Sequence, residues 1–322
     1  MRTYVDRFHI GAGSSVGPLT VFPVWSESAP VPGYDGPNAS NIQIKELDEP
    51  TVSRLTVTNP GRGGLLIPEG TILDGGRQTR IAVRDTFVRA GGARSIDVRC
   101  VEQGRWHGGD DHAVDGRAPI SVIAALRGIG MDQSEAGSQD AVWRRVGRLE
   151  HHFGTRETNS LLDMMQDMGL NQRAERNKFG ATRHEGHNQR RLNPGVLAEV
   201  RRVASRSLPG QAGVLVGLGG EVVALELHGN PDVLSRQLQS MLNAILLDAN
   251  TVEWRPTHGQ KARDFAEEIM YTPVGVVRAS ASSQGFAGVG ESADIRTIAT
   301  PRTAATLHMS VINNKHQVAL AS

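Results

Sequence analysis

The spacing of the apolar residues changes near residue 118, and this change limits the folds that the chain can adopt. Between residues 18 and 102, apolar and polar residues mostly alternate, as they do around Leu55 and Val57. Such alternation, interrupted by Gly, Pro, Asn and Asp, is typical of short β-strands with one buried face. Beyond residue 118, apolar residues recur at helical spacing, as Val142, Val146 and Leu149 do. The sequence therefore predicts an α+β fold.

The predicted fold has two parts. Residues 1–117 form a β-rich part, for which we expect an antiparallel β-sandwich or jelly-roll-like sheet. The pattern does not distinguish an open sandwich from a closed barrel. Residues 118–322 form an α+β part, in which a helical segment precedes a β-hairpin, a helix and further strands. At 322 residues the chain is long enough for two such domains or for one continuous domain.

Several local signals position elements in the second part. Two apolar runs joined by Gly219-Gly220 predict a tight hairpin over residues 213–227, because glycine tolerates the positive φ of primed turns. Asn193-Pro194 and Asn230-Pro231 each predict the start of a helix with Asn as its cap. The polar segment 171–191 lacks apolar periodicity, which predicts a disordered connection or a flexible lid.

Composition argues against several classes of function. Lys and Arg number 35 against 34 Asp and Glu, so the net charge of +1 gives no long-range field that would attract nucleic acid or an anionic membrane. The single cysteine, Cys100, excludes an internal disulfide and a cysteine-based zinc site, and it fits a reducing compartment. No window approaches the roughly 20 apolar residues of a membrane span. We expect a soluble, cytoplasmic protein that binds neither membranes nor nucleic acid. Homo-oligomer formation is left open.

The main candidate for a binding site consists of two polar segments at the ends of predicted strands, where rigid sheets present functional groups. Arginine offers a planar fork for phosphate, tryptophan a stacking face, and glutamine an amide that matches a base or ribose edge. These groups suit a nucleotide-like small molecule. The candidate ligand-binding residues are Asp74, Gln78, Arg80, Glu102, Gln103, Arg105 and Trp106. Alternatively, Glu102 and Arg105 pair with each other or with the backbone, and Trp106 closes the end of the sandwich.

Two further functions stay open, a metal-dependent hydrolase and a structural protein that binds a partner. Imidazole and carboxylate groups bind divalent cations and activate water. The residues for such a site are Glu102, His107, Asp110, Asp111 and His112. Their spacing matches no established ligand pattern, so no metal, cofactor or catalytic residue is assigned. Cys100 shares the parity of Ile96 and Val98, which predicts a buried and inert thiol.

Motifs along most of the chain match a known family. They are Leu19–Val24, Leu65–Arg80, Cys100–Trp106, Gln139–Trp143, residues 213–227 and Leu307–Val311. On these motifs the chain resembles the bacterial family of the ADP-ribosylglycohydrolase- and rhodanese-phosphatase-associated protein domain. The resemblance implies a ligand-binding or accessory protein of an ADP-ribose- or NAD-linked signalling or defence system. The polar segment 171–191 is not part of the family pattern.

Overall fold

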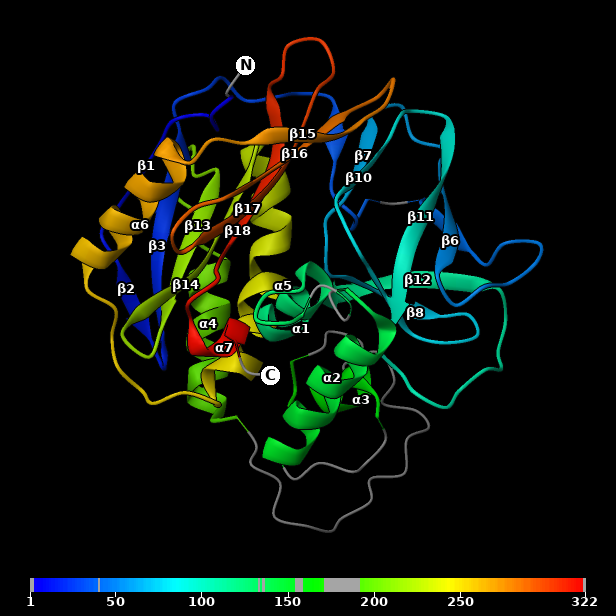
Figure 1. The fold of residues 1–322 in the computed structure, drawn as a ribbon, viewed down its shortest axis with the longest axis horizontal. Helices are drawn as coiled ribbons and strands as arrows, with labels where there is room; N and C mark the ends of the chain where they lie inside the picture. The colour runs from blue at the N-terminus through cyan, green and yellow to red at the C-terminus, as the bar shows by residue number, and fades with distance from the viewer. Residues whose placement is uncertain are drawn as a thin grey trace.

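The computed structural model describes residues 3–39, 41–132, 134, 137–153, 159–170 and 192–320. Figure 1 shows a large sheet on one side of the molecule and a β-barrel on the other, with helices packed around and between them. The α+β class predicted from the sequence is confirmed. The polar segment 171–191 lies outside the described residues.

The large sheet has nine strands, and their pairings are antiparallel. From edge to edge they are β1 (Phe8–Ile10), β3 (Leu19–Ser26), β13 (Gly213–Leu218), β14 (Glu221–His228), β18 (Thr306–Asn313), β17 (Ala293–Ala299), β16 (Gln284–Val289) and β15 (Gly275–Ala279), with β2 (Ser14–Val16) paired to β3. The first three strands of the chain thus share a sheet with strands from its second half. The division at residue 117 stays a prediction.

The hairpin predicted over residues 213–227 is confirmed as β13 and β14. Gly219 and Gly220 adopt φ angles of 59° and 85°, the positive values that a primed turn requires. Side chains alternate across the sheet, so Leu225 and Leu227 pack into the core beneath helix α6 (Gly259–Tyr271). The residues between and after them, Glu226 and His228, point to the opposite face. That face carries the site described below.

A closed barrel stands where the sequence predicts a sandwich or jelly-roll-like sheet. Around the barrel the strands are β11 (Gly92–Cys100), β6 (Arg54–Asn59), β5 (Gln43–Lys45), β12 (Asp111–Arg117), β8 (Thr71–Gly75) and β9 (Arg80–Ala82). Closure follows from β11, because its residues 92–97 pair with β6 while residues 98–100 pair with β9. One strand that bridges two neighbours curls the sheet until its edges meet. Leu55, Val57 and Val98 fill the interior.

A small sheet lies beside the barrel and extends it toward the large sheet. Its strands are β10 (Thr86–Val88), β7 (Gly64–Ile67) and β4 (Tyr34–Asp35), with β4 parallel to β7.

Cys100 at the end of β11 is fully buried, and burial raises the pKa of its thiol. The predicted burial of this cysteine is confirmed.

Helices cover both faces of the large sheet (Figure 1). Besides α6, the helices of the described residues are α1 (Ile120–Arg127), α4 (Pro194–Ala204), α5 (Pro231–Ala249) and α7 (Gln317–Leu320), and, packed against α1 and the barrel strand β11 rather than on the large sheet, α2 (Gln139–Phe153) with the nearby α3 (Leu161–Asp167). The two predicted caps are confirmed, since Asn193 accepts from the amide of Gly195 at 2.8 Å and Asn230 from that of Asp232 at 3.0 Å. No helix in the described ranges is long and apolar enough to cross a membrane.

Candidate functional site

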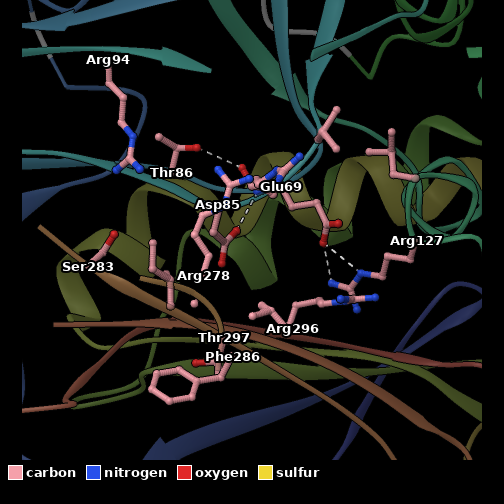
Figure 2. Close-up of a pocket in the computed structure, with 16 residues that line it drawn as sticks. Glu69, Asp85, Thr86, Arg94, Arg127, Arg278, Ser283, Phe286, Arg296 and Thr297 are labelled. Carbon is pink, nitrogen blue, oxygen red and sulfur yellow. Dashed lines mark hydrogen bonds and ion pairs between the residues drawn. The ribbon is translucent and has the colours of Figure 1, made fainter. Parts of the chain in front are cut away.

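A cavity of about 320 Å³ lies between the barrel side of the molecule and the large sheet. In Figure 2, Arg94 and Thr86 line its upper side, and Phe286 and Thr297 line the side along the sheet. The charged residues among its lining are Glu69, Arg84, Asp85, Arg94, Arg127, Arg278 and Arg296. They come from the turn after β7, the β9–β10 connection, β11, the end of α1, β15 and β17. The cavity therefore combines groups from distant parts of the chain.

Positive charge dominates this cavity, because five arginines line it against two carboxylates. Arg94 donates from Nη1 to the uncharged oxygens of Phe87 at 3.2 Å and Ser282 at 3.5 Å. The side chain of Arg278, a residue of β15, makes no hydrogen bond or ion pair with any other residue that the structure describes. Two guanidinium groups thus face the cavity without a carboxylate partner in the described part of the chain.

Two of the cavity's arginines, Arg84 and Arg278, also repel each other. Arg84 Nη2 lies 2.8 Å from Asp97 Oδ2, yet the pKa of its guanidinium is lowered, first by burial and then by the charge of Arg278. Like charges in a partly desolvated wall disfavour each other. The energetic conflict would be relieved by an anion in the cavity.

Arg127 closes one end of the cavity through a buried ion network (Figure 2). Its side chain is 1% exposed, and its Nη2 lies 2.6 Å from Glu69 Oε2 while its Nη1 lies 3.0 Å from Asp294 Oδ1. Arg127 Nη2 also donates to the hydroxyl of Ser310 at 2.9 Å. As the last residue of α1, this cation meets the negative end of the helix dipole. Arg127 therefore ties together α1, the turn after β7 and the large sheet.

A second buried network lies behind Asp85. His308 Nδ1 donates to Asp85 Oδ2 at 2.7 Å, and His308 Nε2 lies 3.4 Å from Glu226 Oε2. Arg117 Nη2 donates to the other oxygen of Glu226 at 2.6 Å. Burial lowers the pKa of His308, but the two carboxylates outweigh burial and raise it to about 9. Burial likewise opposes the ionisation of Glu226, but Arg117 and His308 hold its pKa at about 2.

His228 completes this network as the cross-strand neighbour of His308. The two rings tilt toward each other with their centroids 4.6 Å apart. Burial, followed by the charge of His308, holds the pKa of His228 well below its ordinary value, so the ring is neutral. The three polar side chains Glu226, His228 and His308 thus lie together on one face of the large sheet.

The seven residues predicted from the sequence come together elsewhere, at one end of the barrel. The Glu102 carboxylate accepts from Arg105 Nε and Nη2, each at 2.7 Å, and from the Thr79 amide at 2.9 Å. Thr79 also donates its hydroxyl to Asp74 at 3.1 Å. Gln78 Nε2 lies 3.5 Å from the carbonyl oxygen of Glu102. These contacts match the alternative interpretation, in which Glu102 and Arg105 pair with each other.

The remaining members of the set differ in exposure. Arg80 is fully buried and donates to Glu46 at 3.0 Å and to the carbonyl of Thr51 at 2.9 Å. Gln103 is exposed, and so is Trp106 at 42%, with its ring 5.7 Å from the guanidinium of Arg80. None of the seven lines the 320 Å³ cavity. Their role in ligand binding stays a prediction.

The residues considered for a hydrolytic metal site do not form a cluster. Glu102 binds Arg105, Asp111 lies 3.4 Å from Lys45, and His112 points into the barrel toward Glu46 at 3.2 Å. Within the described ranges, the one group of three potential ligands whose atoms lie within 4.8 Å of each other is Glu226, His228 and His308.

The sequence did contain a signal for this second set. Glu226 and His228 occupy alternate positions of a strand that is otherwise apolar, and His308 and Ser310 do the same in the last strand. Polar residues with this spacing share one face, and a buried face tolerates them only when they have partners. What the sequence could not provide is the pairing of β14 with β18, which brings His228 opposite His308.

No curated protein and no solved structure shows significant similarity to the chain. The model of the ARG and Rhodanese-Phosphatase-superfamily-associated Protein domain matches residues 7–318, which include the barrel, the large sheet and both networks described above. The chain therefore belongs to the family of the ARG and Rhodanese-Phosphatase-superfamily-associated Protein domain.

Proposed function

We propose that the protein binds a phosphate-bearing, nucleotide-like ligand in the arginine-lined cavity. The observation that carries this proposal is the gathering of Arg84, Arg94 and Arg278 around one cavity with too few carboxylates to neutralise them. A phosphate group relieves the repulsion, because guanidinium groups bind its oxygens through paired N–H donors. The volume of about 320 Å³ suits a single small molecule rather than a polymer.

The rest of the lining supports a ligand that is only partly charged. Val277, Phe286 and Ile298 add apolar groups to the lining, and Ser283 and Thr297 add hydroxyl groups. Mixed walls of this kind orient a ligand by its polar end while its apolar part leaves water. A nucleotide combines both ends. The family context favours an ADP-ribose- or NAD-like molecule, and the protein then acts as a ligand-binding or accessory component of such a system.

Calorimetric titration of Arg278→Ala tests the proposal. We expect ADP-ribose or NAD to bind the wild-type protein and to bind the variant at least roughly tenfold more weakly, because a hydrogen bond to a charged group contributes about 1.5–3 kcal/mol. The matched control is Arg62→Ala, since Arg62 is exposed and does not line the cavity. Absence of heat from ADP-ribose, NAD and pyrophosphate with the folded wild-type protein would overturn the proposal.

Titration of Trp106→Ala separates the cavity from the end of the barrel. Trp106 is exposed, so its removal is expected to leave the fold intact. If the cavity is the binding site, the affinity of this variant equals that of the wild type. Loss of affinity in Trp106→Ala together with full affinity in Arg278→Ala would instead assign the ligand to the residues predicted at the barrel end.

A further inference from the structure

The strands of the large sheet bring three metal-ligating side chains together behind the arginine-lined cavity. Glu226 and His228 lie two positions apart on β14, and His308 lies opposite His228 on β18. Their ligand atoms all lie within 4.8 Å of one another, and all three residues are buried. Such a set is unusual on a sheet face, because each buried polar group costs free energy unless it has a partner.

His228 has no such partner in the described part of the chain. It is fully buried, and neither Nδ1 nor Nε2 has a hydrogen-bond partner there. A neutral imidazole carries one donor and one acceptor, so both functions are left unsatisfied. Buried groups of this kind require an explanation, and a bound ion is one of the accepted ones. The guanidinium of Arg117 also has two nitrogens without a described partner, Nε and Nη1.

The other two residues are oriented as metal ligands usually are. Asp85 accepts from His308 Nδ1 at 2.7 Å, which leaves Nε2 directed toward Glu226. A carboxylate that holds the outer nitrogen of a histidine in this way is the common support of metal-bound histidines. Arg117 binds Glu226 Oε1 and leaves Oε2 for another partner.

One distance agrees with an ion between them. His308 Nε2 and Glu226 Oε2 are 3.4 Å apart, which is long for a hydrogen bond between charged groups. Two ligand atoms on a tetrahedral zinc ion with bonds of 2.0–2.1 Å are separated by about 3.3 Å. The observed spacing thus fits two atoms that share an ion.

We propose that Glu226, His228 and His308 bind a divalent transition-metal ion, with Zn²⁺ as the expected occupant. Two imidazoles and one carboxylate are an established zinc ligand set that leaves a fourth position open. On binding, the ion takes the place of the proton at His308 Nε2, which is released to solvent. Arg117 binds Glu226, and its Nε and Nη1, which have no partner in the described part of the chain, could donate hydrogen bonds to a water or hydroxide bound to the ion. This proposal does not depend on ligand binding in the cavity.

The test is the metal content of protein purified without a histidine tag, stripped with a chelator, reloaded with Zn²⁺ and desalted. We expect roughly one zinc per wild-type chain, and retention below roughly a tenth of that in His228→Leu, which replaces the imidazole by an apolar side chain of similar size that cannot bind metal. The matched control is His107→Ala, since His107 is an exposed histidine outside the cluster, and it should retain all its zinc. Equal zinc in His228→Leu and wild type overturns the proposal.

X-ray absorption spectroscopy at the zinc edge keeps the proposal testable if His228→Leu fails to fold. The wild-type spectrum should show nitrogen and oxygen ligands at about 2.0–2.1 Å, with imidazole scattering and no sulfur at about 2.3 Å. Substoichiometric zinc in the wild type, or a sulfur ligand, contradicts the assignment. Calorimetry with Arg278→Ala remains a separate readout, so failure of one proposal leaves the other measurable.

Discussion

Replacement of Arg127 by methionine is expected to lower the free energy of unfolding by about 3–5 kcal/mol, because it leaves buried Glu69 without its ion-pair partner and leaves Asp294 only the more exposed Arg296 at 3.3 Å. Arg127 is 1% exposed, and its partners Glu69 and Asp294 are each 8% exposed. Methionine keeps most of the apolar stem of arginine, so the loss reports on charge rather than on packing. The effect is large because water cannot solvate the two remaining acids.

Urea denaturation of wild type and Arg127→Met measures this loss through the midpoint of unfolding at an unchanged slope. The matched control is Arg202→Met, because Arg202 forms an ion pair with Glu199 at 3.3 Å in which both side chains are well exposed, at 53% and 42%. Surface pairs of this kind contribute roughly 0–1 kcal/mol. Equal effects of the two substitutions would mean that the Arg127 network does not stabilise the junction between α1 and the sheet.

Local features of the fold were predictable from the sequence because their causes are local. The turn at Gly219-Gly220 depends on two residues that accept positive φ, and the caps Asn193 and Asn230 each bond an amide two residues away. The helical stripes and strand alternation follow in the same way from the spacing of apolar residues.

Pairing between distant strands could not be predicted from the sequence. Strand β3 pairs with β13, almost 200 residues later in the chain, and six other strands close a barrel through the split pairing of β11. An alternating pattern says which face of a strand is buried but not which edge it meets. A sandwich and a barrel therefore share one sequence signature.

The candidate site was harder to predict for the same reason. Its arginines come from segments nearly 200 positions apart, such as Arg84 and Arg278, and each alone reads as an ordinary surface residue. The polar segments that the sequence suggested as a binding site, residues 74–80 and 102–106, lie close in sequence and in space. There Glu102 and Arg105 bind each other. Clustering along the chain thus identified an ion network, whereas the cavity depends on the tertiary arrangement.

The second large effect concerns Asp248, a buried acid that joins α5 to the start of α1. It is fully buried, and its Oδ2 accepts from the Ser121 amide at 3.2 Å. The residue before α1, Pro119, provides no side-chain cap, so Asp248 caps this helix from another element. Burial raises the pKa of Asp248 from 3.8 to about 7, although the hydrogen bonds at the helix start and the charge of Arg145 act in the opposite direction.

This raised pKa makes stability fall as the pH rises. Below pH 4 the acid is protonated in both the folded and the unfolded protein, so it contributes no difference. Between about pH 4 and pH 7 only the folded protein holds the proton, and each pH unit lowers the free energy of unfolding by about 1.4 kcal/mol. Above pH 7 the acid is ionised in both states, and the accumulated cost levels off at about 4 kcal/mol.

Asp248→Asn should remove this cost, because asparagine keeps the oxygen that accepts from Ser121 but cannot ionise. We expect the variant to be more stable than the wild type by up to about 4 kcal/mol at pH 8, with the difference shrinking toward zero near pH 4. Urea denaturation across this range measures the difference, in which the titration of all other groups cancels.

Asp264→Asn on the exposed side of α6 serves as the control and should give a small difference. A constant difference between Asp248→Asn and wild type from pH 4 to 8 would show that Asp248 is already ionised in the folded protein, and that burial at the start of α1 is outweighed by the amides and Arg145.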